Sequence, residues 1–187
     1  GKFKLDHFDT TNPIAVGDFV SLETTEHHEF VIHEIHERTN YIIRQSPRNK
    51  HQRHIIASNI DLALSIVTIS QPRTSLGFID RFIAAAESFH IPVKLVINKI
   101  DLLKEKEKQQ LEYMQIVYSR LGYDVICSST ITSEGIDTIK NTLENKTTLV
   151  AGHSGVGKST LLNAINNELN LKTGAISEKW GKGKHTT

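Results

Sequence analysis

Only one cysteine, Cys127, occurs in the 187 residues, and this scarcity excludes several kinds of protein. A single thiol cannot close a disulfide within the chain, and the chain alone cannot build a cysteine-rich zinc site. No apolar run approaches the roughly 18 residues that a membrane span needs, and no signal peptide opens the chain. We therefore expect a reducing, cytoplasmic setting without membrane contact, and Cys127 as a small buried apolar residue.

Acidic residues are missing from two stretches that are rich in lysine and arginine, although the formal net charge is only +1. Residues 40–58 contain none, and residues 173–187 contain only Glu178. Local positive charge favours contact with polyanions, and a solvated loop is the alternative. The candidate contact residues are Arg44, Arg48, Lys50, Arg53, Lys182, Lys184 and His185.

Short alternating strands separated by turns dominate the first 58 residues. Gly17-Asp18 marks a bend or bulge, and residues 46–54 form a basic, polar linker. The spacing fits a small barrel such as an OB-fold, although fold alone does not establish oligonucleotide binding. The expected strands are residues 3–5, 16–22, 30–35 and 41–44.

Beyond residue 58, buried strands alternate with helices. This alternation indicates a parallel sheet covered by helices on both faces. The predicted architecture is therefore an all-β OB-fold barrel (residues 1–56) followed by an α/β domain (residues 57–187). The expected strands are residues 60–69, 93–97, 124–127 and 147–151, and the expected helices are residues 76–89, 105–121, 135–143 and one that continues through residues 161–165.

A glycine-rich sequence, Gly-x-x-x-x-Gly-Lys-Ser, follows the expected strand 147–151 and precedes a helix. This is a P-loop in its required setting, because glycines let successive N–H groups converge on phosphate oxygens at a helix N-terminus. Lys158 is expected to reach the outer phosphates, and the Ser159 hydroxyl to bind Mg²⁺. A plain glycine-rich turn is the alternative. The expected phosphate-binding residues are Gly152, His153, Ser154, Gly155, Val156, Gly157, Lys158, Ser159 and Thr160.

A second motif, Asn98-Lys99-Ile100-Asp101, directly follows the strand expected at 93–97, where ligands of parallel sheets bind. A carboxylate can accept hydrogen bonds from guanine N1–H and N2–H₂ together, and adenine lacks that pair of donors, so a buried Asp101 would reject adenine. The stem of Lys99 can lie over the base, and the Asn98 amide can brace the loop. The motif predicts guanine binding, and an ordinary polar loop is the alternative.

Ser128-Ser129 follow the next expected strand, and Gly135 opens the next helix. A small residue at this place lets a backbone N–H approach the guanine carbonyl oxygen. All these residues expected to bind the base precede the phosphate loop in the sequence, whereas in most GTPases the phosphate loop comes first. Because a binding site depends on spatial neighbours rather than on sequence order, we expect a circularly permuted GTPase.

Together, these motifs resemble the RsgA (YjeQ/YloQ) family of bacterial GTPases of small ribosomal subunit maturation, over essentially the whole chain. The resemblance implies an OB-fold, a permuted GTPase domain and a C-terminal zinc domain. It also implies binding to the 30S subunit and its 16S rRNA, with stimulated hydrolysis of GTP to GDP. The similar stretches are Val16–Asp18, Ala57–Asp61, Ile79–Phe82, Asn98–Asp101, Ser128-Ser129, Gly152–Thr160 and Gly181–Thr187.

Site residues carried over from the family include a switch threonine, Thr186 or Thr187, that would bind Mg²⁺ when the terminal phosphate is present. The basic candidates above would contact rRNA, and no residue is assigned to position the catalytic water. From comparison with the family pattern, we expect the sequence to be a piece of a longer protein. Its first barrel strand would precede Gly1, and its Asp-x-x-Gly loop, two sheet strands and zinc domain would follow Thr187. We expect this piece to bind the nucleotide as a monomer, and we expect the longer protein to hydrolyse GTP.

Three other functions share part of this pattern. The first is a P-loop ATPase or kinase, which Asp101 disfavours because it selects guanine. The second is an RNA-binding module with a vestigial nucleotide pocket, which the intact Lys158 and Ser159 disfavour. The third is a translation factor that pairs an OB-fold with a GTPase, and the permuted motif order disfavours it.

Overall fold

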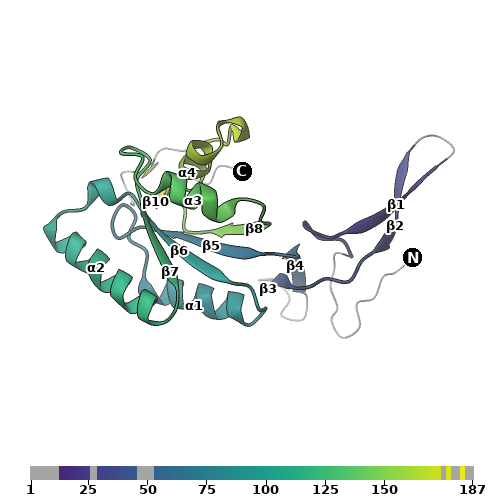
Figure 1. The fold of residues 1–187 in the computed structure, drawn as a ribbon, viewed down its shortest axis with the longest axis horizontal. Coiled ribbons are helices and arrows are strands. Elements are labelled where there is room, and N and C mark those ends of the chain that lie inside the picture. Colours follow the sequence, from purple (N-terminus) through teal and green to yellow (C-terminus); the bar gives the residue numbers. More distant parts are fainter. Residues whose placement is uncertain (1–12, 26–28, 46–52, 174–175, 178–181, 184–187) are drawn as a thin grey trace.

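A four-stranded parallel sheet forms the centre of the protein (Figure 1). The structure is a computed structural model that describes residues 13–25, 29–45, 53–173, 176–177 and 182–183. The strands lie in the order β7-β6-β5-β8, and every neighbouring pair is parallel. They are β5 (Leu62–Val67), β6 (Val93–Asn98), β7 (Asp124–Ser128) and β8 (Thr148–Ala151).

Two helices cover each face of this sheet, which confirms the α/β arrangement predicted from the sequence. In Figure 1, α1 and α2 lie below the sheet, and α3 and α4 lie above it. Each pair of helices closes a separate hydrophobic core against the strands. The helices are α1 (Leu76–Glu87), α2 (Glu105–Arg120), α3 (Ile136–Leu143) and α4 (Lys158–Ile165).

Strand β5 contributes to both cores, and all six of its residues are buried. Such a nearly continuous apolar run, interrupted only by Ser65, is typical of a parallel strand that is covered on both faces. Ala63 and Val67 belong to the core under α1 and α2, whereas Leu64 and Ile66 belong to the core under α3 and α4. Because successive side chains of a strand alternate between faces, one apolar strand ties the two layers of helices together.

Helix α1 begins at a side-chain cap. The Ser75 hydroxyl accepts a hydrogen bond from the Phe78 backbone N–H, at 3.3 Å, which satisfies one of the free donors of the first turn. Ile79, Ile83 and Ala86 recur at helical spacing and form the buried face. The opposite end of α1 leads to Phe89, whose ring lies 5.5 Å from that of Tyr41 in the N-terminal part.

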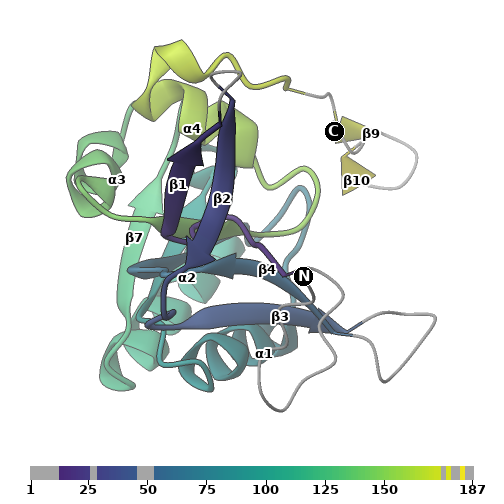
Figure 2. The ribbon, with the colours of Figure 1, turned by 90° about the vertical axis from the view of Figure 1, so that its right-hand side faces the viewer.

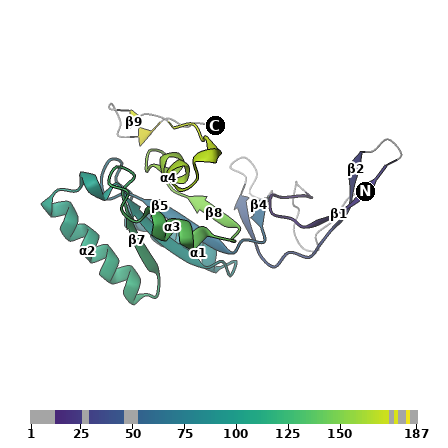
Figure 3. The same cartoon turned by 45° about the horizontal axis from the view of Figure 1, so that its top comes forward.

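The N-terminal part consists of two separate antiparallel strand pairs in the described residues, so the predicted OB-fold barrel is not confirmed. The pair β1–β2 extends away from the central sheet (Figures 1 and 3), and its residue Phe30 is 72% exposed. The paired strands are β1 (Val20–Thr24) with β2 (Phe30–Ile35), and β3 (Tyr41–Gln45) with β4 (Arg53–Ser58).

Two local predictions in this part were wrong. The strand expected over residues 16–22 begins only at Val20, because the chain turns at Gly17 and Val16 makes a single bridge to Ala57. The linker expected to run through His54 ends earlier, because β4 begins at Arg53 and pairs with β3. The strand expected over residues 3–5 lies outside the described residues.

A polar junction joins these strands to the start of the central sheet; we use this name for Asp18, Arg38, Asn40, Ser58 and Asn59. The Asp18 carboxylate accepts hydrogen bonds from Arg38 Nε and Nη2, both at 2.6 Å, and from Ser58 Oγ at 2.5 Å. The Asp18 and Arg38 side chains are only 1% and 6% exposed. A buried ion pair of this kind is retained only with good geometry and extra hydrogen bonds, and both are present.

The second half of the polar junction uses two asparagine side chains. Asn40 Nδ2 donates to the Ile60 carbonyl at 2.8 Å, and Asn40 Oδ1 accepts from the Ile60 N–H at 2.7 Å. Asn59 Oδ1 accepts from the Thr39 N–H at 2.9 Å, and Asn59 Nδ2 donates to the Gly17 carbonyl at 2.8 Å. The side chains therefore replace a regular ladder where the chain passes from β4 towards β5.

Smaller elements complete the described chain. They include two short helical turns and a pair of two-residue strands that lies apart from the central sheet (Figure 2). No helix within the described residues is both long and apolar enough to cross a membrane. The small elements are η1 (Ile100–Leu102), η2 (Asn167–Leu169), β9 (Ile176–Ser177) and β10 (Lys182–Gly183).

Candidate nucleotide-binding site

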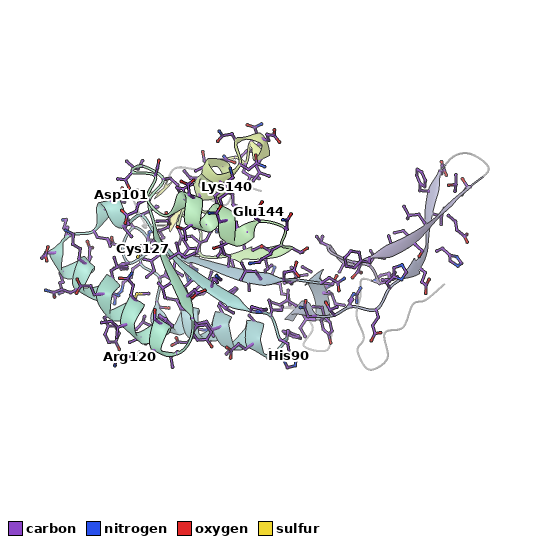
Figure 4. All side chains as sticks on the ribbon, viewed as in Figure 1. His90, Asp101, Arg120, Cys127, Lys140 and Glu144 are labelled. Atoms are coloured by element: carbon purple, nitrogen blue, oxygen red, sulfur yellow. The ribbon has the colours of Figure 1, made fainter. Side chains whose placement is uncertain are left out.

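The predicted base-reading and phosphate-binding segments meet at the carboxyl edge of the sheet. Asn98 and Ser128 end the neighbouring strands β6 and β7, and they are partners in the parallel register. The phosphate loop follows β8 at the same edge. Figure 4 shows Asp101 at this edge and His90 near the opposite end of the sheet. Parallel sheets bind ligands at the carboxyl ends of their strands, so this arrangement matches the expected position of a site.

Glycine is required at two positions of the phosphate loop. A Cβ on Gly152 would lie 2.3 Å from the Ile66 carbonyl oxygen, and a Cβ on Gly157 would lie 2.6 Å from Asn98 Nδ2. Gly157 also has a φ of 95° and directly precedes helix α4. The loop therefore packs closely against the central sheet and the base-reading segment, and it ends at a helix N-terminus suited to an anion.

Lys158, the first residue of α4, points its ammonium group back over the phosphate loop. Lys158 Nζ donates to the carbonyl oxygens of Gly152 and His153, both at 2.9 Å. Burial lowers the pKa of Lys158. A partly buried cation whose neighbours are neutral carbonyls is well suited to bind phosphate oxygens, since a charge-assisted bond is stronger than one between neutral groups.

Asn98 connects the phosphate loop to the rest of the base-reading edge. Its side chain is 2% exposed, and Asn98 Nδ2 donates to the Val156 carbonyl at 2.9 Å. Asn98 Oδ1 accepts from Ser128 Oγ at 3.1 Å. One buried amide thus holds together three segments that are widely separated in the sequence.

Lys99 makes a second link to the phosphate loop. Lys99 Nζ donates to the Gly155 carbonyl at 2.7 Å and to the Gln71 carbonyl at 2.9 Å. The residue has a φ of 64°, a left-handed conformation that is uncommon for a non-glycine residue and is often found at functional sites. Burial lowers the pKa of Lys99, and the Asp101 carboxylate partly opposes this effect.

Asp101 is held by Ser129 on the neighbouring loop. Ser129 Oγ donates to Asp101 Oδ1 at 2.5 Å, and the same hydroxyl accepts from the N–H groups of Ile131 and Thr132 at 3.1 and 3.2 Å. The Ser129 residue is buried, whereas Asp101 is exposed and not buried as the sequence argument assumed. Selection of guanine therefore requires the base itself to cover the carboxylate.

The remaining residues of the two motifs support these contacts. Ile100 lies in η1 and packs against the core under α1 and α2, which fixes the loop that carries Asp101. Val156 is fully buried in the other core, so its backbone carbonyl stays in place for Asn98. Ser159 and Thr160 lie in the first turn of α4, directly after Lys158. The structure therefore brings the base-reading and phosphate segments together.

Several expected site residues are not part of this cluster. Arg44 is exposed on β3, Arg53 begins β4, and Lys182 begins β10. The predicted residues that lie outside the described part of the chain are Arg48, Lys50, Lys184, His185, Thr186 and Thr187.

Two contacts at the site involve residues that the sequence analysis did not single out. The Gln71 carbonyl binds Lys99, and the Phe78 ring lies against His153 of the phosphate loop, with centroids 4.0 Å apart. A backbone carbonyl leaves no sequence signal, and Phe78 reads as an ordinary apolar residue of a helix. The nearby stretch Ile79–Phe82 was noted only for its family resemblance.

The comparisons with known proteins agree with this geometry. The family model described as RsgA GTPase matches residues 35–187. The chain belongs to the RsgA GTPase family. This result confirms the resemblance that was based on the motifs.

Curated RsgA relatives match along the whole of this chain. The small ribosomal subunit biogenesis GTPase RsgA of Bacteroides fragilis (strain YCH46) is 45% identical over 187 residues, which cover 100% of this chain and 60% of that protein. The corresponding protein of Flavobacterium johnsoniae is 46% identical over 190 residues, with coverage of 100% and 58%. The chain therefore spans no more than about 60% of the length of these relatives.

Solved RsgA-type structures share the fold. The crystal structure of YjeQ from Thermotoga maritima aligns with a TM-score of 0.73 and 35% identity, over 85% of this chain and 53% of that chain. The structure of YloQ, described as a circularly permuted GTPase, aligns with a TM-score of 0.64 and 31% identity, over 89% and 56%. The description of YloQ agrees with the circular permutation that we predicted from the order of the motifs.

Proposed function

We propose that the protein binds guanine nucleotides at the carboxyl edge of its sheet and, as part of a longer protein, hydrolyses GTP to GDP during maturation of the 30S ribosomal subunit. The observation that carries this proposal is the buried Asn98 side chain, which bonds the phosphate loop at Val156 and the second base-reading loop at Ser128. These contacts support the proposal because they bring together two motifs that stand in the reverse of their usual order.

The base would be held by the segment from Asn98 to Asp101 together with Ser128 and Ser129. Ser129 already orients one Asp101 oxygen, so the carboxylate can accept the paired guanine donors without first being positioned. The stem of Lys99 would lie along the base, because its ammonium is anchored at Gly155.

Phosphates would be bound by the N–H groups of residues 152–160 and by Lys158. Ser159 fits a magnesium site, because its hydroxyl oxygen is a hard donor in the first turn of α4, next to the expected phosphates. One hydroxyl cannot complete six-fold coordination, so phosphate oxygens, water and Thr186 or Thr187 would supply the other ligands. Magnesium would neutralise charge on the phosphates, and Lys158 with the loop N–H groups would stabilise the charge that develops during attack by water.

The subunit would be engaged through the basic residues at the N-terminal strands and near residues 182–185. This part of the proposal is supported by the relatives, which are named small ribosomal subunit biogenesis GTPases. An OB-fold over residues 1–56, a permuted GTPase domain from residue 57, a cytoplasmic monomer and a zinc domain in the longer protein belong to the same proposal. Contacts to 16S rRNA would come from the exposed Arg44 and its basic neighbours.

Nucleotide competition tests the proposed binding directly. A fluorescent GDP bound to the full-length protein should be displaced by GTP and GDP at low concentration, and by ATP only at concentrations at least about 100-fold higher. Displacement by ATP as effective as that by GTP would instead favour an ATPase or kinase. Equal affinity of the 30S subunit for the protein with GDP and with a GTP analogue would favour an RNA-binding module.

A further inference from the structure

A ring contact joins the phosphate loop to helix α1. The His153 and Phe78 rings lie with centroids 4.0 Å apart and planes inclined by 37°. His153 is the second residue of the loop, and Phe78 lies in the first turn of α1, 75 positions earlier in the sequence. Such aromatic contacts contribute beyond the apolar area that they bury.

Phe78 is the fixed partner of this contact. Its backbone N–H donates to both the carbonyl and the hydroxyl of Ser75, so the first turn of α1 is capped at this residue. The Phe78 side chain also packs against the core under α1 and α2. His153, in contrast, is an exposed residue of a loop. The contact therefore restrains the loop against a rigid helix.

The position of His153 matters because its backbone carbonyl is one of the two that hold the Lys158 ammonium. The second half of the loop is held by Asn98 at Val156 and by Lys99 at Gly155. These bonds do not contact the first half directly, where the His153 carbonyl also accepts from the Val156 N–H, at 3.5 Å. The ring contact is placed to hold that half and the Lys158 ammonium with it.

We propose that Phe78 is a positioning residue for the phosphates, acting through the His153 ring to hold the first half of the phosphate loop in its binding conformation. The inference rests on the proposed nucleotide binding, and it adds a residue from outside both motifs. Loops that are ordered before binding lose less entropy when the ligand arrives, so loss of the contact should weaken affinity.

Four variants of the full-length protein test this role, with fluorescent GDP and a fluorescent GTP analogue as probes. Phe78→Leu and His153→Ala remove the ring contact and should raise the Kd for both nucleotides about 3- to 10-fold. Phe78→Tyr keeps both rings and should stay within about 2-fold of wild type. The double variant Phe78→Leu/His153→Ala should bind no more weakly than either single variant, because both changes remove one interaction.

Phe82→Leu is the matched control, since Phe82 lies one turn later in α1 and packs against the same core. It should lower the midpoint of thermal unfolding about as much as Phe78→Leu while leaving both Kd values unchanged. Equal loss of affinity in Phe82→Leu, additive losses in the double variant, or unchanged affinity in Phe78→Leu would overturn the inference. Wild-type protein that binds no guanine nucleotide would instead overturn the proposed function, and the inference would fail with it.

Discussion

At the scale of single residues, Asp101 is the group whose chemistry is most easily changed without disturbing its surroundings. Its Oδ1 accepts from Ser129, and its exposed position leaves the carboxylate open to a ligand. Asn98, in contrast, is buried and bonded on both sides of its amide, so its loss would disturb the loops themselves.

Asp101→Asn should shift the base preference from guanine towards xanthine. The amide oxygen can still accept from N1–H, but the amide nitrogen is a donor where the second carboxylate oxygen accepted, so the guanine 2-amino group loses its acceptor, whereas the xanthine carbonyl at C2 gains a donor. We expect GDP affinity to fall about 100-fold or more and XDP affinity to rise, as measured by competition with a fluorescent nucleotide. Glu134→Gln, a change of the same kind on the exposed part of the neighbouring loop, should leave the preference unaltered. Retained GDP affinity in Asp101→Asn would contradict the guanine-reading role.

At the scale of elements, the polar junction links the N-terminal strands to the central sheet. Asp18→Ala would leave the Arg38 guanidinium buried without its main partner, and we expect the free energy of unfolding to fall by about 3–5 kcal/mol. Urea denaturation provides the measurement. Asp124→Ala is the matched control, because it removes a partly exposed ion pair with Lys94 that is nearly as short, at 2.7 Å, and should cost less than about 1 kcal/mol. Similar losses in both variants would show that burial of the junction adds nothing.

The same junction predicts a pH dependence of stability. Burial alone would raise the pKa of Asp18, but hydrogen bonds from Arg38, Ser58 and Ala15 lower it from 3.8 to about 2. Because the folded-state pKa lies below the unfolded one, the stabilisation is complete above about pH 4 and disappears as the pH falls through 2. It amounts to about 2 kcal/mol. The difference in unfolding free energy between wild type and Asp18→Asn should therefore shrink from pH 5 to pH 2, and a constant difference would contradict this prediction.

At the scale of the whole molecule, the proposed GTP hydrolysis stimulated by the 30S subunit is the property to measure. The full-length protein should hydrolyse GTP faster when purified 30S subunits are added. A chain limited to residues 1–187 should bind GDP but respond weakly, because the matched region covers about 60% of the RsgA relatives. Release of inorganic phosphate measures GTP hydrolysis by the full-length protein and by the shorter chain. A full response from residues 1–187 would show that the regions beyond them are dispensable for stimulation.

The central sheet could be predicted because its strands are mostly apolar, such as β5 with five apolar residues of six, which is typical of parallel strands covered on both faces. The meeting of Asn98 and Ser128 with the phosphate loop also followed from the sequence, since all lie at carboxyl ends of parallel strands. The polar junction could not be found in this way. Asp18 and Ser58 are 40 residues apart, and no periodic pattern records a contact between them. The alternation of apolar and polar residues located β2 and β3 correctly, but it does not determine which strands pair into a barrel.

The order of the motifs also has a consequence for synthesis of the chain. Translation proceeds from the N-terminus, so β5, β6 and β7 with the base-reading residues leave the ribosome before β8 and the phosphate loop. The later strand then adds beside β5, through the parallel pairing of Leu62 with Thr148 and of Ser65 with Ala151. Until Val156 follows and accepts its bond from Asn98, the nascent chain can present the elements that read a base but has no loop to bind phosphates.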